Sequence, residues 1–211
     1  YSAITDSYAT IWSEINVACE SCHGPGSDHL DWAQFQGRSG SQSAANNGLK
    51  VQYGKSVNWV IASGTSIASA QGDPHQAAIA ETQSCAGCHS RRSKISQDPI
   101  NNHPGGGGFL DHYRLQTLQQ DLYHADGQIQ DEVYVYGSFI QSKMYQRGVT
   151  CSNCHNPHSL ELVAQGNDLC AGCHAPEAYD QPSHHFHKQE GSSGAQCVNC
   201  HMPATLYMGV D

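Results

Sequence analysis

Residues 151–201 decide the fold, because this stretch holds three copies of one short pattern: Cys151-Ser152-Asn153-Cys154-His155, Cys170-Ala171-Gly172-Cys173-His174 and Cys197-Val198-Asn199-Cys200-His201. Each copy reads C-x-x-C-H. Two further copies stand upstream, at Cys19–His23 and Cys85–His89. The five motifs use ten cysteines, and the chain has ten cysteines. No cysteine is left over for another role.

C-x-x-C-H is typical of the covalent attachment of c-type haem. Its two thiols add to the two vinyl groups of a porphyrin, and its histidine becomes the proximal ligand of the iron. The pattern therefore predicts five covalently attached haem c groups. The cofactor-binding residues would be Cys19, Cys22, Cys85, Cys88, Cys151, Cys154, Cys170, Cys173, Cys197 and Cys200, and the proximal ligands His23, His89, His155, His174 and His201.

Two other uses of paired cysteines fit the pattern less well. Disulfide bonds within C-x-x-C would close very small loops and crosslink no distant segments, although an even cysteine count suits a disulfide framework. A zinc site with four cysteine ligands would not require a histidine directly after every second cysteine, yet all five motifs have one.

The composition is thin for a protein core made of side chains. Only 38% of the 211 residues are hydrophobic, the mean hydropathy is -0.53, and 21 residues are glycine. Charged residues make up only 14%, which is low for a disordered chain. Five apolar porphyrins would supply the missing buried surface. We therefore expect a mainly α fold with much irregular loop and little or no sheet, wrapped round five stacked haems.

The spacing of the motifs predicts how the haems are distributed. The motifs begin at residues 19, 85, 151, 170 and 197, so the last three are close together and the first two are widely spaced. We expect a single pentahaem domain over 1–211, with haems 1 and 2 in its N-terminal part, 1–148, and haems 3 to 5 clustered at 149–211.

Charge and hydropathy limit which partners and which cellular compartment are expected for the protein. The formal net charge is -9 and no basic run is present, which argues against nucleic acid as a partner. No apolar stretch approaches the roughly 20 residues of a transmembrane segment. The chain begins at Tyr1 rather than Met, so we expect a mature exported protein, periplasmic or extracellular, whose leader has been removed.

Periodicity and punctuation predict several elements. Apolar residues from Ile4 to Ile15 at helical spacing favour a helix from near Thr5 into the first motif. Further helices are expected over 29–36, from Asp73-Pro74 to Cys85, over 109–122, and over 138–147 with an end at Gly148. We expect a loop over 37–72 with one apolar piece at 57–61, and irregular chain over 91–108. Residues 133–136 fit strand and helix equally.

Fourteen histidines minus five proximal ones leave nine candidates for the sixth position of the irons: His29, His75, His103, His112, His124, His158, His184, His185 and His187. His158 lies three residues after His155, and three residues span at most about 11 Å. That is too little to pass round a porphyrin to its opposite face, so His158 would serve a neighbouring haem.

The remaining candidates are less constrained. At most two of His184, His185 and His187 are expected to be ligands. His112 and His124 lie in an aromatic region. Methionine is an alternative axial ligand that would raise the reduction potential, but the surplus of histidine disfavours Met144, Met202 and Met208. Histidine on both sides of every iron would give low-potential haems that do not react with small ligands.

Several stretches resemble a known group of proteins: Cys19–His29, Phe109–Tyr113, Tyr123–Met144, Cys151–Ser159 and Gly191–Met208. They are similar to the haem domain of multihaem c-type cytochromes associated with tetratricopeptide repeats, within the wider multihaem nitrite-reductase-like group. The resemblance implies bis-histidine haems in alternating stacked and T-shaped pairs. It also implies the distal ligands His29, His112, His124, His158, and one or both of His184 and His187.

Two functions follow as hypotheses. The first is electron transfer along a row of closely packed haems, either to other redox proteins or within a head-to-tail extracellular filament of copies of the same chain. The alternative is a reductase of nitrite- or hydroxylamine-type substrates, which needs one haem with an open distal position. The surplus of histidine and the five regular motifs favour electron transfer without catalysis.

Overall fold

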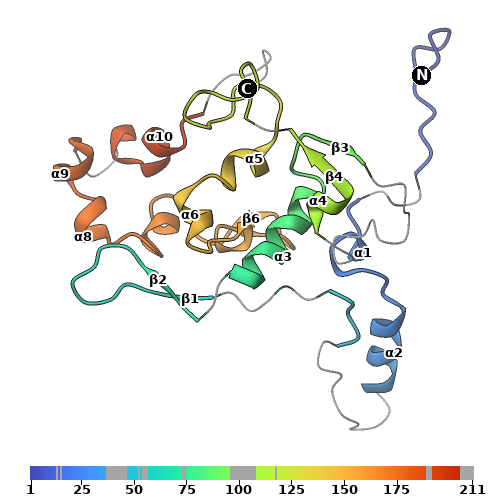
Figure 1. Cartoon of the computed structure of the whole chain (residues 1–211), viewed down its shortest axis with the longest axis horizontal. Helices are drawn as coiled ribbons and strands as arrows, with labels where there is room; N and C mark the ends of the chain where they lie inside the picture. The colour runs from blue at the N-terminus through green and yellow to red at the C-terminus, as the bar shows by residue number, and fades with distance from the viewer. Residues whose placement is uncertain are drawn as a thin grey trace.

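The structure is a computed structural model of the chain. It describes residues 1–211 except 13, 15, 37–46, 52, 54–56, 73–74, 96–107, 117, 189–191 and 205–211. The molecule is elongated (Figure 1). Helices α1 (Glu20–His23) and α2 (Ser27–Gln36) lie at one end. Helices α8 (Pro176–Tyr179), α9 (Pro182–His185) and α10 (Cys197–His201) lie at the other.

Short helices fill the middle of the molecule. The longest described helix is α3 (His75–Ala86), which runs into the second C-x-x-C-H motif. The others are α4 (Phe109–His112), α5 (Val135–Phe139), α6 (Lys143–Gln146) and α7 (Asp168–Ala171), with 3-10 turns η1 (Cys151–Asn153) and η2 (Ser193–Ala195). The described helices lack both the length and the apolar character needed to cross a bilayer.

The described sheets are three separate antiparallel pairs of two strands each. They pair β1 (Asn58–Val60) with β2 (Ser69–Gln71), β3 (Arg92–Lys94) with β4 (Tyr113–Leu115), and β5 (His155–Asn156) with β6 (Glu161–Leu162). Short helices, long loops and little sheet confirm the predicted fold class.

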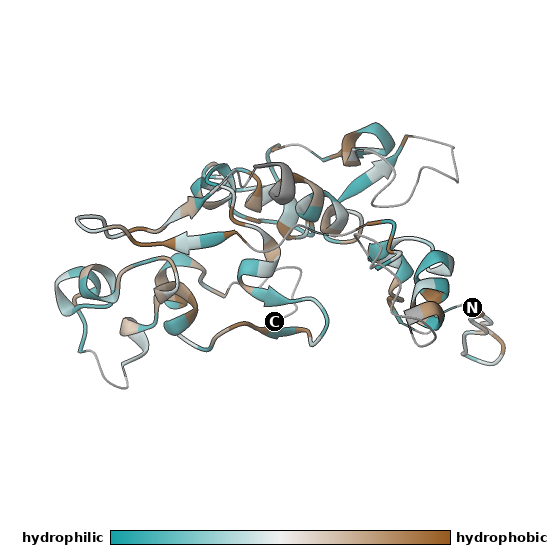
Figure 2. Cartoon of the chain, turned by 90° about the horizontal axis from the view of Figure 1, so that it is seen from below, coloured by the Kyte–Doolittle hydropathy of each residue, from teal (hydrophilic) through white to brown (hydrophobic). Residues whose placement is uncertain are grey.

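The described apolar core is small and lies in the middle of the chain. One cluster joins Ala86, Phe109 and Tyr136, and a second joins Leu122, Tyr123 and Val133. Most large apolar side chains elsewhere are exposed, and Figure 2 shows brown segments along thin, open ribbons. The buried side chains alone therefore make too small a core for a chain of this size, as the composition predicted.

The helix expected from Thr5 into the first motif is wrong. Described residues before Glu20 form turns and extended chain, with one bridge between Ser2 and Ser7. Ile4 is 98% exposed and Ile11 is 97% exposed. An isolated short helix is marginal in water unless its apolar face is packed, and no described surface covers this one.

Two central expectations also need correction. The helix expected over 109–122 ends at His112, and Tyr113–Leu115 turns into strand β4. Its partner β3 lies in the stretch 91–108, which was expected to be irregular. Tyr113 stacks on Phe109, with ring centres 5.3 Å apart, so the aromatic contact is kept across the change from helix to strand.

The loop expected over 37–72 contains one hairpin, because the apolar piece at 57–61 supplies strand β1. Of residues 133–136, Val135 and Tyr136 begin helix α5, whereas Val133 and Tyr134 lie before it in neither helix nor strand. The helix expected over 138–147 is divided between α5 and α6. That segment ends at Gly148, whose φ of 90° is the left-handed conformation expected of a terminating glycine. The helix over 29–36 is confirmed and begins slightly earlier, at Ser27, and the helix reaching Cys85 is confirmed.

Candidate haem-binding site

The C-x-x-C-H motifs fold mainly as single helical turns. In motif 1 the backbone N–H of His23 donates to the carbonyl of Cys19 at 2.9 Å, and in motif 4 His174 donates to Cys170 at 2.8 Å. Motif 2 repeats this bond, and motif 5 is helix α10. Residues three and four positions apart lie on the same face of a helix. The turn therefore places both thiols and the histidine of a motif on one side.

The ten cysteines are all free thiols. Burial raises the pKa of the Cys22, Cys154 and Cys173 thiols above the ordinary value. Among the described residues, no group of three or more His, Cys, Asp or Glu side chains has the arrangement of a metal site. The donors fit thioether bonds to haem.

The thiols of neighbouring motifs lie near one another, and the Tyr53 hydroxyl forms hydrogen bonds with the Cys22 carbonyl of motif 1 and with Ser84, directly before motif 2. Burial raises the pKa of Cys22, and the nearby thiols of Cys85 and Cys88 raise it further. The Cys85 thiol donates a hydrogen bond to Cys151, which raises the pKa of Cys85 and lowers that of Cys151. Motif 1 therefore lies beside motif 2, and motif 2 beside motif 3.

The same pattern continues to the last motif. The pKa of Cys154 is raised by burial and then by the neighbouring Cys173, and Cys197 is close enough to Cys170 to form a hydrogen bond with it. Asn167 links the same pair, because its side chain accepts from the backbone N–H of Cys197 at 3.0 Å. The five motifs thus adjoin one another in sequence order.

The ring of His23 is fixed on one side by backbone contacts. Its Nδ1 donates to the carbonyl of Val51 at 3.0 Å, and the Val51 N–H donates to the His23 carbonyl at 3.1 Å. A hydrogen bond at Nδ1 fixes the tautomer and leaves Nε2 free for a metal. This is the arrangement that a proximal haem ligand requires.

The ring of His158 lies near the ring of His23. The two imidazole rings have centres 6.2 Å apart and planes within 5° of parallel. Metal–imidazole bonds are about 2 Å long and the ligating nitrogen lies about 1.1 Å from the ring centre, so two imidazoles across one metal have centres about 6.2 Å apart. The pair therefore fits the two axial positions of one iron.

A second histidine pair has the same dimensions at the other end of the molecule. The rings of His184 and His201 have centres 6.2 Å apart and planes within 5° of parallel. Between this pair and motif 4 lies Tyr179, whose ring packs edge-on against His174 and against His184, each at 5.5 Å. This one aromatic ring therefore contacts histidines of two neighbouring haem positions.

Two other histidines have buried ring nitrogens without a hydrogen-bond partner in the described structure. They are His112, at both nitrogens, and His185, at Nε2. A buried polar atom without a partner is costly, and a metal bond would remove that cost. His185 was not among the residues that the family resemblance implied. It was, however, among the nine candidates that the count of histidines gave, within the cluster of three at 184–187.

The remaining predicted ligands are less enclosed. The Nδ1 of His29 donates to the carbonyl of Asn47 at 2.7 Å, and its ring stacks on Trp32. Gly48 makes this loop possible, since a Cβ at that position would lie 2.4 Å from the Asp28 carbonyl oxygen. The imidazole of His124 is exposed, and that of His187 lies against Gly194. The side chain of His75 and all of His103 fall outside the described residues.

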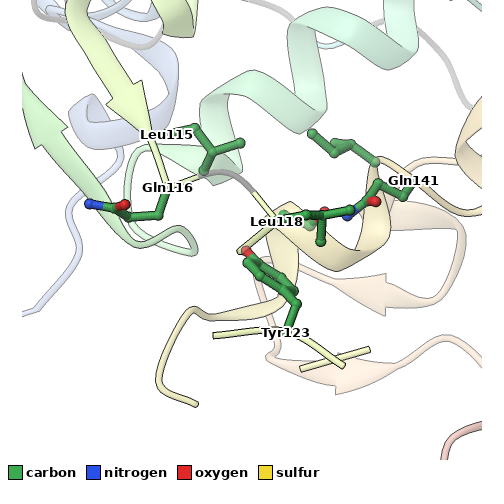
Figure 3. A pocket seen from close by; sticks show the side chains of 7 residues that line it. Leu115, Gln116, Leu118, Tyr123 and Gln141 are labelled. Carbon is green, nitrogen blue, oxygen red and sulfur yellow. The ribbon is translucent and has the colours of Figure 1, made fainter. Parts of the chain in front are cut away.

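An apolar pocket of about 330 Å³ lies between strand β4 and helix α5 (Figure 3). It is lined by Leu115, Gln116, Leu118, Tyr123, Gly137, Ile140 and Gln141. None of these residues is a cysteine or a histidine, so we place no haem iron there.

The comparisons with known proteins address the motifs directly. The family described as the doubled CXXCH motif matches residues 144–179, which contain motifs 3 and 4. No curated protein and no solved structure matches the chain. The doubled motif shows that the chain is similar to c-type cytochromes, which bind haem covalently and transfer electrons. The placement of the thiols and the histidine on one side of a helical turn agrees with this.

Proposed function

We propose that the chain carries five covalently attached haems c, ordered in space as in the sequence, and passes electrons along this row. The single observation that carries the proposal is that consecutive motifs lie close together, with hydrogen bonds between the thiols of Cys85 and Cys151 and of Cys170 and Cys197. Because each thiol would be bonded to a porphyrin edge, neighbouring thiols require neighbouring porphyrins.

Two of the irons would be coordinated by histidine on both sides. The 6.2 Å spacing supports His23 with His158 at haem 1, and His201 with His184 at haem 5. His158 would then serve a haem other than the one attached beside it, as its distance in sequence requires. His89, His155 and His174 remain the proximal ligands of haems 2 to 4, with His112 and His185 among the candidates for their distal positions.

Bound haem supplies reversible one-electron chemistry at iron. The protein's own part is to hold each imidazole in place and to keep the porphyrins close together. Two histidine ligands leave an iron no open position for a substrate, which favours electron transfer over reduction of nitrite or hydroxylamine. The pattern of residues further suggests membership of the multihaem cytochromes associated with tetratricopeptide repeats.

The proposed partners are other redox proteins or further copies of the chain. Motifs 1 and 5 lie toward opposite ends of the elongated molecule (Figure 1), so electrons could enter at one end and leave at the other. His29 lies at the end that carries motif 1, and its Nδ1 donates a hydrogen bond to the Asn47 carbonyl. Haem 1 would not need His29 as a ligand, because His23 and His158 would occupy both of its positions. Such an arrangement suits head-to-tail assembly into an extracellular filament. We place the protein in the periplasm or outside the cell, where haem c is attached.

The proposal is tested on protein matured by a haem-attachment system. Intact mass should equal the polypeptide plus five haems, and electron paramagnetic resonance of the oxidised protein should show low-spin iron only. Fewer than five haems would contradict the proposed count. A high-spin signal together with nitrite-dependent oxidation of the reduced protein would instead support the reductase. Negative-stain images would distinguish filaments from discrete particles.

A further inference from the structure

Glu81 of helix α3 forms a two-point contact across the junction between motif 2 and motif 3. Its Oε1 accepts from the backbone N–H of Ser152 at 2.7 Å, and its Oε2 accepts from the Ser152 hydroxyl at 2.8 Å. Ser152 is the residue between the two cysteines of motif 3 that follows Cys151 directly. The partners are 71 positions apart in the sequence, so the contact joins the two parts of the chain.

The same carboxylate lies close to the thiols of both motifs. Its negative charge is one of the contributions that raise the pKa of Cys85 and of the Tyr53 hydroxyl, and it opposes the lowering of the Cys151 pKa by the hydrogen bond from Cys85. Cys85 and Cys151 are the first cysteines of motifs 2 and 3. A charge near both sulfurs is near the edges of both porphyrins.

No described cation neutralises this charge. The ion pairs between described residues join Lys50 to Asp28 and Arg91 to Asp131, and neither involves Glu81. The Glu81 side chain is partly buried, and water screens a partly buried charge less than an exposed one.

We propose that Glu81 is a positioning residue that fixes haem 3 against haem 2 and, through its charge, lowers the reduction potentials of these two haems relative to the rest of the row. This inference rests on the proposed function, since it requires haems at motifs 2 and 3. A negative charge stabilises ferric over ferrous iron, because reduction adds negative charge nearby. Haems 2 and 3 would then favour the oxidised state. An electron crossing the row would have to pass these two low-potential haems.

The test compares Glu81→Gln with the wild-type holoprotein. Glutamine keeps the shape and one acceptor oxygen for Ser152, but it removes the charge. Glu14→Gln, in the exposed N-terminal segment, makes the same chemical change away from the motifs and serves as the matched control. Haem methyl resonances followed by nuclear magnetic resonance through a reductive titration report each haem separately.

Glu81→Gln should make two of the five haems easier to reduce and leave the other three unchanged. At a fixed applied potential, the reduced-to-oxidised ratio of those two haems should rise about tenfold, as expected for a unit charge about 10 Å away at an effective dielectric constant of about 20. Glu14→Gln should leave all five unchanged. Glu81→Ala should reproduce the shift and also alter the resonances of haem 3, because both bonds to Ser152 are lost.

Two results would overturn this inference. One is an unchanged titration of all five haems in Glu81→Gln, and the other is a uniform shift of all five. Failure of the proposed function would be visible earlier and separately, as wild-type protein that lacks haem at motif 2 or motif 3. A purely structural role for Glu81 would show as altered resonances in Glu81→Ala with no change of potential in Glu81→Gln.

Discussion

The two parts of the chain are held together in different ways. Among the described residues of 1–148, both apolar clusters are closed by buried side chains such as Phe109, Val133 and Tyr136. In the described part of 149–211, the buried hydrophobic residue is Ala195, while Leu160 is 87% exposed and Phe186 is 84% exposed. The second part carries three of the five motifs. Where motifs are dense, few described apolar side chains are buried, as we expect if haems supply the core there.

Producing the polypeptide without haem should have the largest effect on its structure, and the effect should differ between the two parts of the chain. In polypeptide produced without haem attachment, we expect hydrogen exchange to be protected over parts of 109–140 and unprotected throughout 149–204, because only the first region has a core of its own. Exchange is read by peptide mass spectrometry. Equal protection in both regions would show that side chains, and not haem, hold the second part.

Removing a distal histidine should change one haem at a time. His158→Ala should convert the iron of motif 1 from low spin to high spin, because its sixth ligand is lost. Ser159→Ala changes the neighbouring exposed residue and should leave every iron low spin. Electron paramagnetic resonance measures both variants. If His158→Ala stays fully low spin with no replacement ligand detected, the pairing with His23 is wrong.

Shortening a valine to alanine should lower the free energy of unfolding in the first part of the chain, where Val133 is buried, and hardly change it in the second part, where Val163 is exposed. Val133 is fully buried, and Val133→Ala should lower the free energy of unfolding by about 2 kcal/mol through lost contacts and a cavity. Val163 is 54% exposed, and Val163→Ala should change it by less than about 0.5 kcal/mol. Denaturant unfolding of the holoproteins, followed by circular dichroism, compares the two. Equal costs would remove the distinction between the regions.

The smallest effect is expected at Tyr179, within the second part. Tyr179→Leu removes the ring that packs edge-on against His174 and His184, so the imidazole planes of haems 4 and 5 should rotate. Their low-spin resonance positions should shift without loss of haem. Tyr179→Phe keeps the ring and should match the wild type, and Tyr8→Leu should have no effect. Unchanged spectra in Tyr179→Leu would show that the ring does not orient these ligands.

The sequence predicted the motifs, the fold class and several helices for physical reasons that are local. Gly148 ends its helical segment because glycine tolerates a positive φ, and helix α3 reaches Cys85 as its composition suggested. The N-terminal helix failed because periodicity reports an apolar face but not whether anything packs on it. The strand β4 was missed because its pairing with β3 depends on residues far apart in the sequence.

The candidate site shows the same limit. The motif residues could be named from the sequence because their spacing is fixed by one helical turn. The partner of a distal histidine is set by tertiary structure, so the sequence placed His158 on a neighbouring haem without saying which one. The sequence listed His184, His185 and His187 together as candidates, and the buried Nε2 of His185 is a feature that only the structure reveals.

The order of the irons tests the central claim most directly. An experimental structure of the haem-loaded protein, with irons located by their anomalous scattering, should show five irons in a single row that follows motifs 1 to 5, with His158 on the iron of motif 1 and His184 on that of motif 5. Irons in a different order, or porphyrins too far apart for electron tunnelling, would contradict the account.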